Sequence, residues 1–163
     1  MTTTETTAAT TADEEKLAIS DELVLPPASP ELEAQRRHSL DQACQIARIA
    51  EEYRGRDIVV LDLTSVTPVF DYFVIASGTN PRQMFALADQ VRVTMKSQGN
   101  ACLGTEGETH SNWLVQDYGD IVLHIFQPET RQLYDLERLW ADARKVDWRA
   151  HLGLPAALPT ESL

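Results

Sequence analysis

The 163-residue sequence has little positive charge and no long hydrophobic run. Only 14 Lys and Arg residues stand against 25 Asp and Glu residues, which gives a net charge of −11. This balance opposes broad binding to nucleic-acid phosphates, because such binding depends on clustered positive charge. No run of about 18 apolar residues is present, and the first residues lack the basic and apolar regions of a secretion signal. We therefore expect a soluble cytoplasmic protein with a basic partner, without membrane attachment or direct sequence-specific binding of nucleic acid.

Cysteine and histidine are also sparse. The two cysteines, Cys44 and Cys102, lie far apart in apolar segments, so neither a CxxC motif nor a disulfide framework is indicated. We expect both to be buried, reduced thiols. The four histidines have no HxxxH or HExxH spacing and no neighbouring cysteine, which argues against a zinc site. Neither a metal nor a cofactor is expected.

Composition divides the chain into three parts. Residues 1–37 are rich in Thr, acidic residues and Pro, and we expect a disordered acidic tail because so little apolar surface can offset the entropy of ordering. The apolar patch Leu17–Leu25 could be a docking segment, although a short mixed stretch is more often plain tail. Residues 38–148 are long enough for one core, and residues 149–163, with two prolines that break helices, read as a C-terminal tail.

Alternating helix and strand signals predict an α/β domain with a mixed sheet flanked by helices. One helix should begin at Ser39, with Gln42 completing a capping box, and a second should follow the cap at Asn80 and end before Gly99. A third is expected from about Asp135. Helical spacing predicts a buried stripe in the second helix, formed by Met84, Leu87, Ala88, Val91 and Met95, and a docking stripe in the third, formed by Leu136, Leu139, Trp140 and Ala143. The expected strands are 58–61, 72–77, 101–104, 112–118 and 121–127.

The last two strands are close enough to form a hairpin. A turn at Gly119-Asp120 is favoured over one at Tyr118-Gly119, because the second would place Asp117 opposite Asp120. The favoured register pairs Trp113 with Phe126, Val115 with His124 and Asp117 with Val122. One face of the hairpin is then apolar, and the other mixes aromatic with titratable residues.

The mixed face allows two interpretations. If helices cover both sides of the sheet, its aromatic residues belong to the core; if not, they offer a contact surface of the kind that Trp and Tyr commonly provide. The charges of Asp117 and His124 favour exposure, because unpaired charge is costly to bury.

The sequence gives weaker signals for a group of catalytic residues. The turn Ser77-Gly78-Thr79-Asn80, between a strand and a helix, is where backbone amides often hold phosphate. Nucleotidyl transfer also needs two carboxylates one residue apart on a strand to hold Mg²⁺. Asp57 and Asp62 are five positions apart, so they point to opposite faces of a strand, while Asp117 and Asp120 flank a turn and Glu106-Gly107-Glu108 is more typical of a solvated turn. The sequence therefore favours a binding protein over an enzyme.

Three segments resemble the ribosomal silencing factor RsfS family, also called Iojap: DIVVLDL (57–63), DYFVIASGTNPRQ (71–83) and EGETHSNWLVQDYGDIVLHIFQPETRQLYDLERLW (106–140). The resemblance spans about residues 39–147. It implies a fold like that of nucleotidyltransferases without their catalytic residues. It also implies a translational repressor that binds the large ribosomal subunit through the basic ribosomal protein number fourteen and blocks association with the small subunit.

The resemblance leaves alternatives open. Organelle relatives act in assembly of the large subunit, and a nucleotidyltransferase-like enzyme is the less favoured alternative. Family members are commonly dimers, so a homodimer is expected when the chain is free. Carried onto this sequence, the expected partner contacts are Trp113, Asp117, Tyr118, Asp120, His124, Phe126, Glu129, Arg131 and Tyr134.

Overall fold

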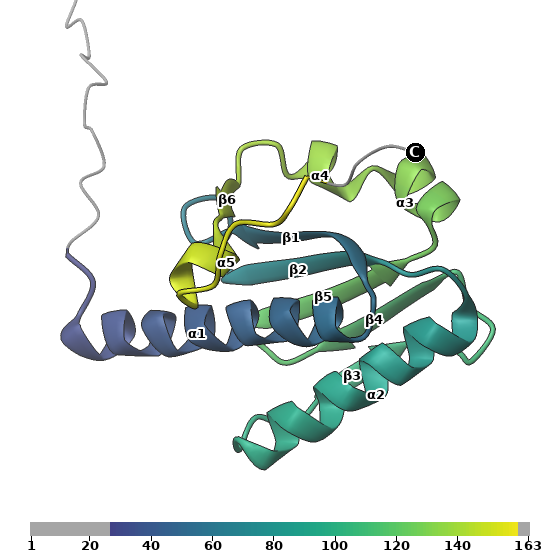
Figure 1. Cartoon of the computed structure of the whole chain (residues 1–163). Helices are drawn as coiled ribbons and strands as arrows, with labels where there is room; N and C mark the ends of the chain where they lie inside the picture. Colours follow the sequence, from purple (N-terminus) through teal and green to yellow (C-terminus); the bar gives the residue numbers. More distant parts are fainter. Residues whose placement is uncertain (1–26, 160–163) are drawn as a thin grey trace, which may run out of the picture.

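The computed structural model describes residues 27–159. Most of the expected acidic tail, including the patch Leu17–Leu25, lies outside the described residues. Within them, the chain forms a six-stranded sheet with helices on both faces (Figure 1). The mixed α/β architecture predicted from the alternating helix and strand signals is confirmed.

The sheet combines parallel and antiparallel pairing. Its strands are β1 (Arg56–Asp62), β2 (Tyr72–Ser77), β3 (Gly104–Glu106), β4 (Trp113–Asp117), β5 (Ile121–Phe126) and β6 (Arg144–Val146). Their spatial order is β3-β4-β5-β2-β1-β6. Only β2 and β5 run parallel, and every residue of these two central strands is buried. β3 and β6 are short edge strands.

The two faces are covered unequally. The long helices α1 (Pro30–Glu52) and α2 (Pro81–Ser97) lie on one face (Figure 1). The other face carries only α3 (Pro128–Tyr134) and α4 (Leu136–Leu139), which are short. Buried apolar side chains form one cluster on each face, and the cluster under α1 and α2 is the larger. The thinner cover leaves part of the second face accessible.

The first helix begins earlier than the sequence analysis predicts. Ser29 caps α1 by accepting a hydrogen bond from the Leu32 amide at 3.2 Å, and Pro30 occupies the first helical turn. Ser39, the predicted cap, is instead a buried residue within the helix and donates to Asp120 at 3.3 Å. Residues 30–37, expected in the disordered tail, are therefore helical.

The second helix agrees with its prediction. The side chain of Asn80 accepts from the Gln83 amide at 2.9 Å, and Pro81 follows the cap. The buried stripe predicted from helical spacing is confirmed; it consists of Met84, Leu87, Ala88, Val91 and Met95.

The C-terminal third differs most from expectation. The helix predicted from about Asp135 is only the four-residue α4, and the short helix α3, which was not predicted, precedes it. Asp135 separates the two helices because it adopts a left-handed conformation with φ of +44°. The chain then adds β6 to β1, which no local pattern indicated. The fifth helix, α5 (Trp148–His151), packs on α1 and buries Trp148, and its residues 149–151 were expected to be tail.

The cysteines differ in environment. Cys44 is buried in the core under α1, where burial and then the nearby charge of Asp41 raise the pKa of its thiol to about 12. It is therefore a protonated, unreactive thiol at neutral pH. Cys102 is only partly buried, beside β3. No helix among residues 27–159 combines the length and apolar character that crossing a membrane requires.

Candidate functional site

The hairpin of β4 and β5 has the predicted register. Trp113 pairs with Phe126, Val115 with His124 and Asp117 with Val122. At the turn, the Tyr118 amide donates to the Ile121 carbonyl at 2.9 Å, and Gly119 takes a φ of +86° that favours glycine. The carboxylate of Asp117 accepts from the Gly119 amide at 2.7 Å and so shapes the turn. The preferred turn at Gly119-Asp120 is confirmed.

The mixed side of this hairpin forms a continuous group of aromatic rings, which we name the aromatic face. It consists of Phe70, Phe73, Trp113, His124, Phe126, Tyr134 and Trp140. Trp113 is at its centre, with ring centroids 4.7 Å from Phe126 and 4.8 Å from Tyr134. Strands β2, β4 and β5 supply the inner rings, while Tyr134 and Trp140 come from the segment of α3 and α4. The face thus combines strand residues with residues of the short helices that cover it.

His124 orients the central tryptophan. Its Nδ1 accepts a hydrogen bond from Nε1 of Trp113 at 3.3 Å, which places the imidazole proton on Nε2. Burial lowers the pKa of His124 to about 4, so the ring is neutral at physiological pH. Its Nε2 is buried and has no hydrogen-bond partner among the described residues. The expectation that a charge on His124 favours exposure is therefore wrong, because the histidine is buried in its neutral form.

Both interpretations of the mixed face hold in part. Phe126 is fully buried and belongs to the core, whereas Trp113 is only half-buried. Tyr134 is 56% exposed, and Leu133 and Leu139 on the same short helices are 78% and 74% exposed. Large apolar side chains at such exposure, beside a half-buried tryptophan, are typical of contact surfaces.

Arg131 fixes α3 against the sheet. Its guanidinium donates to the hydroxyl of Ser77 at 2.8 Å and to the carboxylate of Glu137 at 3.1 and 2.6 Å. Burial alone raises the pKa of Glu137, but the hydrogen bonds and charge of Arg131 outweigh it and hold that pKa below its usual range. Only 11% of the Arg131 side chain is exposed. Arg131 therefore joins α3 and α4 to β2 and sets the position of Tyr134.

Two predicted contact residues lie elsewhere. Tyr118 is buried on the opposite face, under α1 and α2, and its hydroxyl donates to Gln116 at 2.8 Å. Burial raises its pKa. Asp120 accepts hydrogen bonds from Gln35 at 3.1 Å and from Ser39, so it attaches the hairpin turn to α1. Glu129 is exposed on α3, beside Ser77 and Arg131 and outside the group of aromatic rings.

In the turn after β2, a side chain of the following helix occupies a backbone amide that could otherwise bind a phosphate. The Thr79 amide donates to the side chain of Gln83 at 2.7 Å, where a nucleotide phosphate would otherwise be held. A Cβ atom at Gly78 would lie 2.2 Å from Cγ of Met84, so this glycine allows close packing of the helix. Within residues 27–159, no three His, Cys, Asp or Glu side chains form a group able to hold a metal.

Sequence reasoning missed the exposed leucines. Leu139 was expected in a buried helical stripe, but α4 ends at this residue and leaves it outside. Leu133 precedes Tyr134 in a helix too short for its periodicity to be read. Their only sequence signal is an apolar residue next to an aromatic one in a polar segment.

Comparison with known protein families and with related proteins identifies relatives of this chain. A family model described as "Ribosomal silencing factor during starvation" matches residues 36–160. The chain is 39% identical over 90 residues to the ribosomal silencing factor RsfS of Chromobacterium violaceum, covering 55% of this chain and 74% of that protein. It is 33% identical over 98 residues to the mouse protein "Mitochondrial assembly of ribosomal large subunit protein 1", covering 58% and 43% of the two chains.

Solved structures of related proteins have a similar fold. A crystal structure of a protein from Chromobacterium violaceum superposes with a TM-score of 0.58 at 36% sequence identity, covering 63% of this chain and 86% of that one. The names of the relatives describe regulation and assembly of the ribosome, and not an enzymatic reaction. The resemblance seen in the sequence is confirmed: the chain belongs to the ribosomal silencing factor family.

Proposed function

We propose that this protein binds the large ribosomal subunit through the aromatic face, contacts the basic ribosomal protein number fourteen, and thereby prevents the small subunit from joining. The observation that carries this proposal is the exposed edge of the aromatic face, where Trp113 on β4 is partly accessible and Leu133 and Tyr134 on α3 are exposed. The family membership supports the large subunit as the partner.

The contact surface is held in place before binding. Trp113 is stacked on Phe126 and bonded to His124, and Arg131 fixes the helix that carries Tyr134. Side chains that are already ordered lose little entropy on association, so more of the contact energy appears as affinity. Buried Trp and Tyr anchors typically dominate such interfaces.

Charge favours a basic protein over RNA. The net charge of −11 attracts a basic surface and is repelled by the phosphates of the surrounding ribosomal RNA. Glu129 adds an exposed carboxylate on α3, the helix that also carries Tyr134. Charge therefore steers the protein, while the aromatic contacts supply most of the binding energy.

The proposed mechanism is steric. A protein that occupies the surface between the two subunits excludes the small subunit without transforming any molecule, and its effect depends on its affinity and concentration. Translation then falls in proportion to the fraction of large subunits that are occupied.

The test compares two tyrosine variants of the full chain. Tyr134→Ala removes an exposed ring of the aromatic face, whereas Tyr53→Ala removes a ring that is 37% exposed at the far end of α1. In sedimentation with isolated large subunits, we expect Tyr134→Ala to weaken binding and subunit exclusion about tenfold or more, and Tyr53→Ala to leave both unchanged. Wild-type protein that stays at the top of the gradient, or equal binding by both variants, would refute the proposal.

Assembly of the large subunit is a second candidate, because the mouse relative is named for that process. Precursor ribosomal RNA that accumulates in cells without the protein, with normal subunit joining in vitro, would favour assembly over silencing. The homodimer expected from the family resemblance stays a prediction, which sedimentation of the free protein can check.

A further inference from the structure

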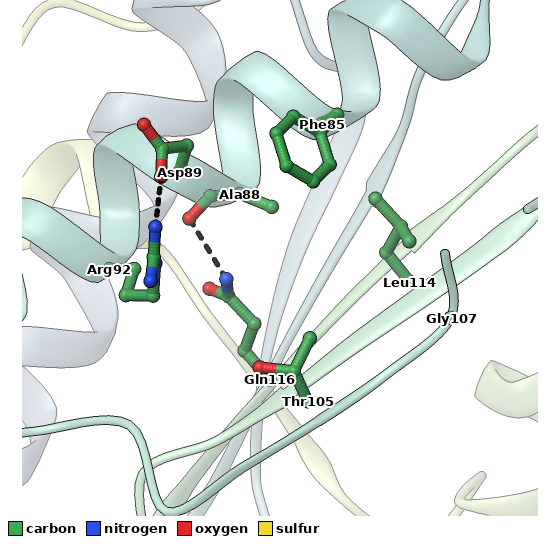
Figure 2. Close-up of a pocket in the computed structure, with 8 residues that line it drawn as sticks. All are labelled: Phe85, Ala88, Asp89, Arg92, Thr105, Gly107, Leu114 and Gln116. Carbon is green, nitrogen blue, oxygen red and sulfur yellow. Dashed lines mark hydrogen bonds and ion pairs between the residues drawn. The ribbon is translucent and has the colours of Figure 1, made fainter. Parts of the chain in front are cut away.

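A small cavity lies on the side of the sheet opposite the aromatic face. Its volume is about 200 Å³, and it separates α2 from strands β3 and β4. Figure 2 shows Phe85, Ala88 and Arg92 on the helix and Thr105 and Leu114 on the strands, with their side chains around one space. Arg92 is paired with Asp89, so its charge is satisfied at the rim. We name this space and the neighbouring edge of β3 the edge groove.

The edge groove has an apolar floor and an open side. Ala88 and Leu114 are buried at its base, but Phe85 remains 46% exposed. Leu103, immediately before β3, is 74% exposed. Exposed apolar side chains beside a cavity can bind an apolar side chain from another segment.

The strand beside the cavity can accept another strand. All three residues of β3 are exposed, and in the described part of the chain it pairs only with β4. Thr105 pairs with Gln116, whose side chain donates to the Ala88 carbonyl at 2.9 Å, so both residues face α2. A strand added to β3 would therefore direct alternate side chains into the groove.

The first turns of α1 lie near one end of this edge. Near its start, α1 contacts the hairpin turn, because Gln35 and Ser39 both donate to Asp120. The adjacent Gly119 is next to Leu103, since a Cβ atom on the glycine would lie 3.6 Å from the leucine side chain. The first residue of β3 follows Leu103. The hairpin turn at Gly119-Asp120 therefore lies between the first turns of α1 and the residue that precedes β3.

The patch Leu17–Leu25 has the pattern of a half-covered strand. Leu17, Ile19, Leu23 and Leu25 recur with period two, interrupted only by Asp21. The alternate positions carry small or polar side chains, apart from Val24. As a strand, the patch would extend about 30 Å, enough to pass from α1 along β3.

From these observations we infer that residues 17–25 add to β3 as an antiparallel edge strand and place apolar side chains in the edge groove. The direction follows from the connection: the segment leads into α1, whose first turns contact the hairpin turn near the first residue of β3, so a strand formed by the segment would run against β3. A second copy paired through β3 is a weaker occupant, because three residues of strand bury far less than the roughly 1,200 Å² of a stable interface. A segment of the same chain has the advantage of high effective concentration.

This docking would protect an edge that otherwise invites pairing with other chains. It uses the face of the sheet opposite the one proposed to bind the ribosome. The inference therefore does not depend on the proposed function, and either can fail alone.

Hydrogen exchange of the full chain tests the inference. The double variant Leu17→Asp/Ile19→Asp places charge on the apolar side of the segment, and the matched variant Ala18→Asp/Ser20→Asp adds the same charge to the other side. We expect amides in residues 103–107 to exchange about tenfold faster in the first variant than in the wild type, and at the wild-type rate in the second. Neither double variant changes a residue of the described strands, so the exchange of β2 and β5 should not change.

Three results would overturn the inference. Equal exchange of residues 103–107 in the wild type and in Leu17→Asp/Ile19→Asp would show that the segment does not cover β3. Equal acceleration by both variants would show that charge alone matters and not the apolar side. Protection that increases with protein concentration would assign the edge to a second copy of the chain.

Discussion

Lowering the pH should destabilise this protein through His124. The pKa of this buried histidine is lowered to about 4, whereas an unfolded histidine has a pKa near 6.5. Between these two values the unfolded chain binds a proton that the folded chain does not, so the free energy of unfolding falls as the pH falls. Above about pH 7 neither state is protonated and the full stability is present.

The size of the effect follows from the two pKa values. Between pH 7.5 and 5.0, the proton bound by the unfolded state costs about 2 kcal/mol of stability. Other groups contribute differently. Burial raises the pKa of Asp62, but hydrogen bonds from Thr64 and Arg144 lower it below its usual value, so its contribution is lost only at more acidic pH. Burial and then Asp120 raise the pKa of Asp71, which opposes acid destabilisation.

The assay is urea unfolding at several pH values, comparing the wild type with His124→Phe. The variant loses the hydrogen bond from Trp113 and will be less stable at pH 7.5, but its stability should vary less between pH 7.5 and 5.0, by about 2 kcal/mol. Contributions of the carboxylates cancel in the difference between the two proteins. His110→Phe, at an exposed loop position, is the matched control and should keep the wild-type pH dependence.

Identical pH dependence in His124→Phe and the wild type would refute this reasoning. It would mean that His124 binds a proton equally well in the folded and the unfolded chain. Its ring would then not be buried between Trp113 and Phe73, whose ring centroids lie 5.9 and 4.8 Å from that of His124.

Two further predictions concern contacts that position the site. Arg131→Met should lower the free energy of unfolding by about 2 to 3 kcal/mol, because it leaves Ser77 and Glu137 without their partner. Arg138→Met, at an exposed position, is the control and should change the free energy of unfolding by less than about 0.5 kcal/mol. Urea unfolding measures both variants, and equal effects would contradict the role of Arg131. Gly78→Ala should lower the free energy of unfolding by about 1 to 3 kcal/mol, because its Cβ atom would clash with Met84. Adding Met84→Ala to the same chain should recover part of that stability. If thermal unfolding shows that the two substitutions act independently, the contact between these residues is disproved.

The sequence was most informative where local signals agree. The hairpin register followed from the alternation of residues, the turn at Gly119-Asp120 and the repulsion between Asp117 and Asp120, and all of these act within a few residues. The capped start of α2 is local in the same way. Such features need no knowledge of the remaining fold, which explains why they could be predicted.

Other features depend on distant partners. β6 is stabilised by pairing with β1, and the ion pair of Arg144 with Asp62 joins residues far apart in the sequence. The start of α1 had a local signal in Ser29 and Pro30, but the acidic composition around it is equally typical of disorder. Its first turns have tertiary contacts such as the hydrogen bond from Gln35 to Asp120. Tertiary contacts decided these cases, and composition could not reveal them.

The candidate site shows the same division between local and distant information. The pairing of Trp113 with Phe126 was predicted from register, but the contact of Arg131 with Ser77 requires the fold. That contact decides which aromatic residues remain accessible, because it holds α3 so that Tyr134 stands beside Trp113 while Phe126 is covered. If two long helices covered this face as they cover the other, the same sequence motif would form core alone. The unequal cover of the sheet is therefore what turns a packing motif into a surface that can bind a partner.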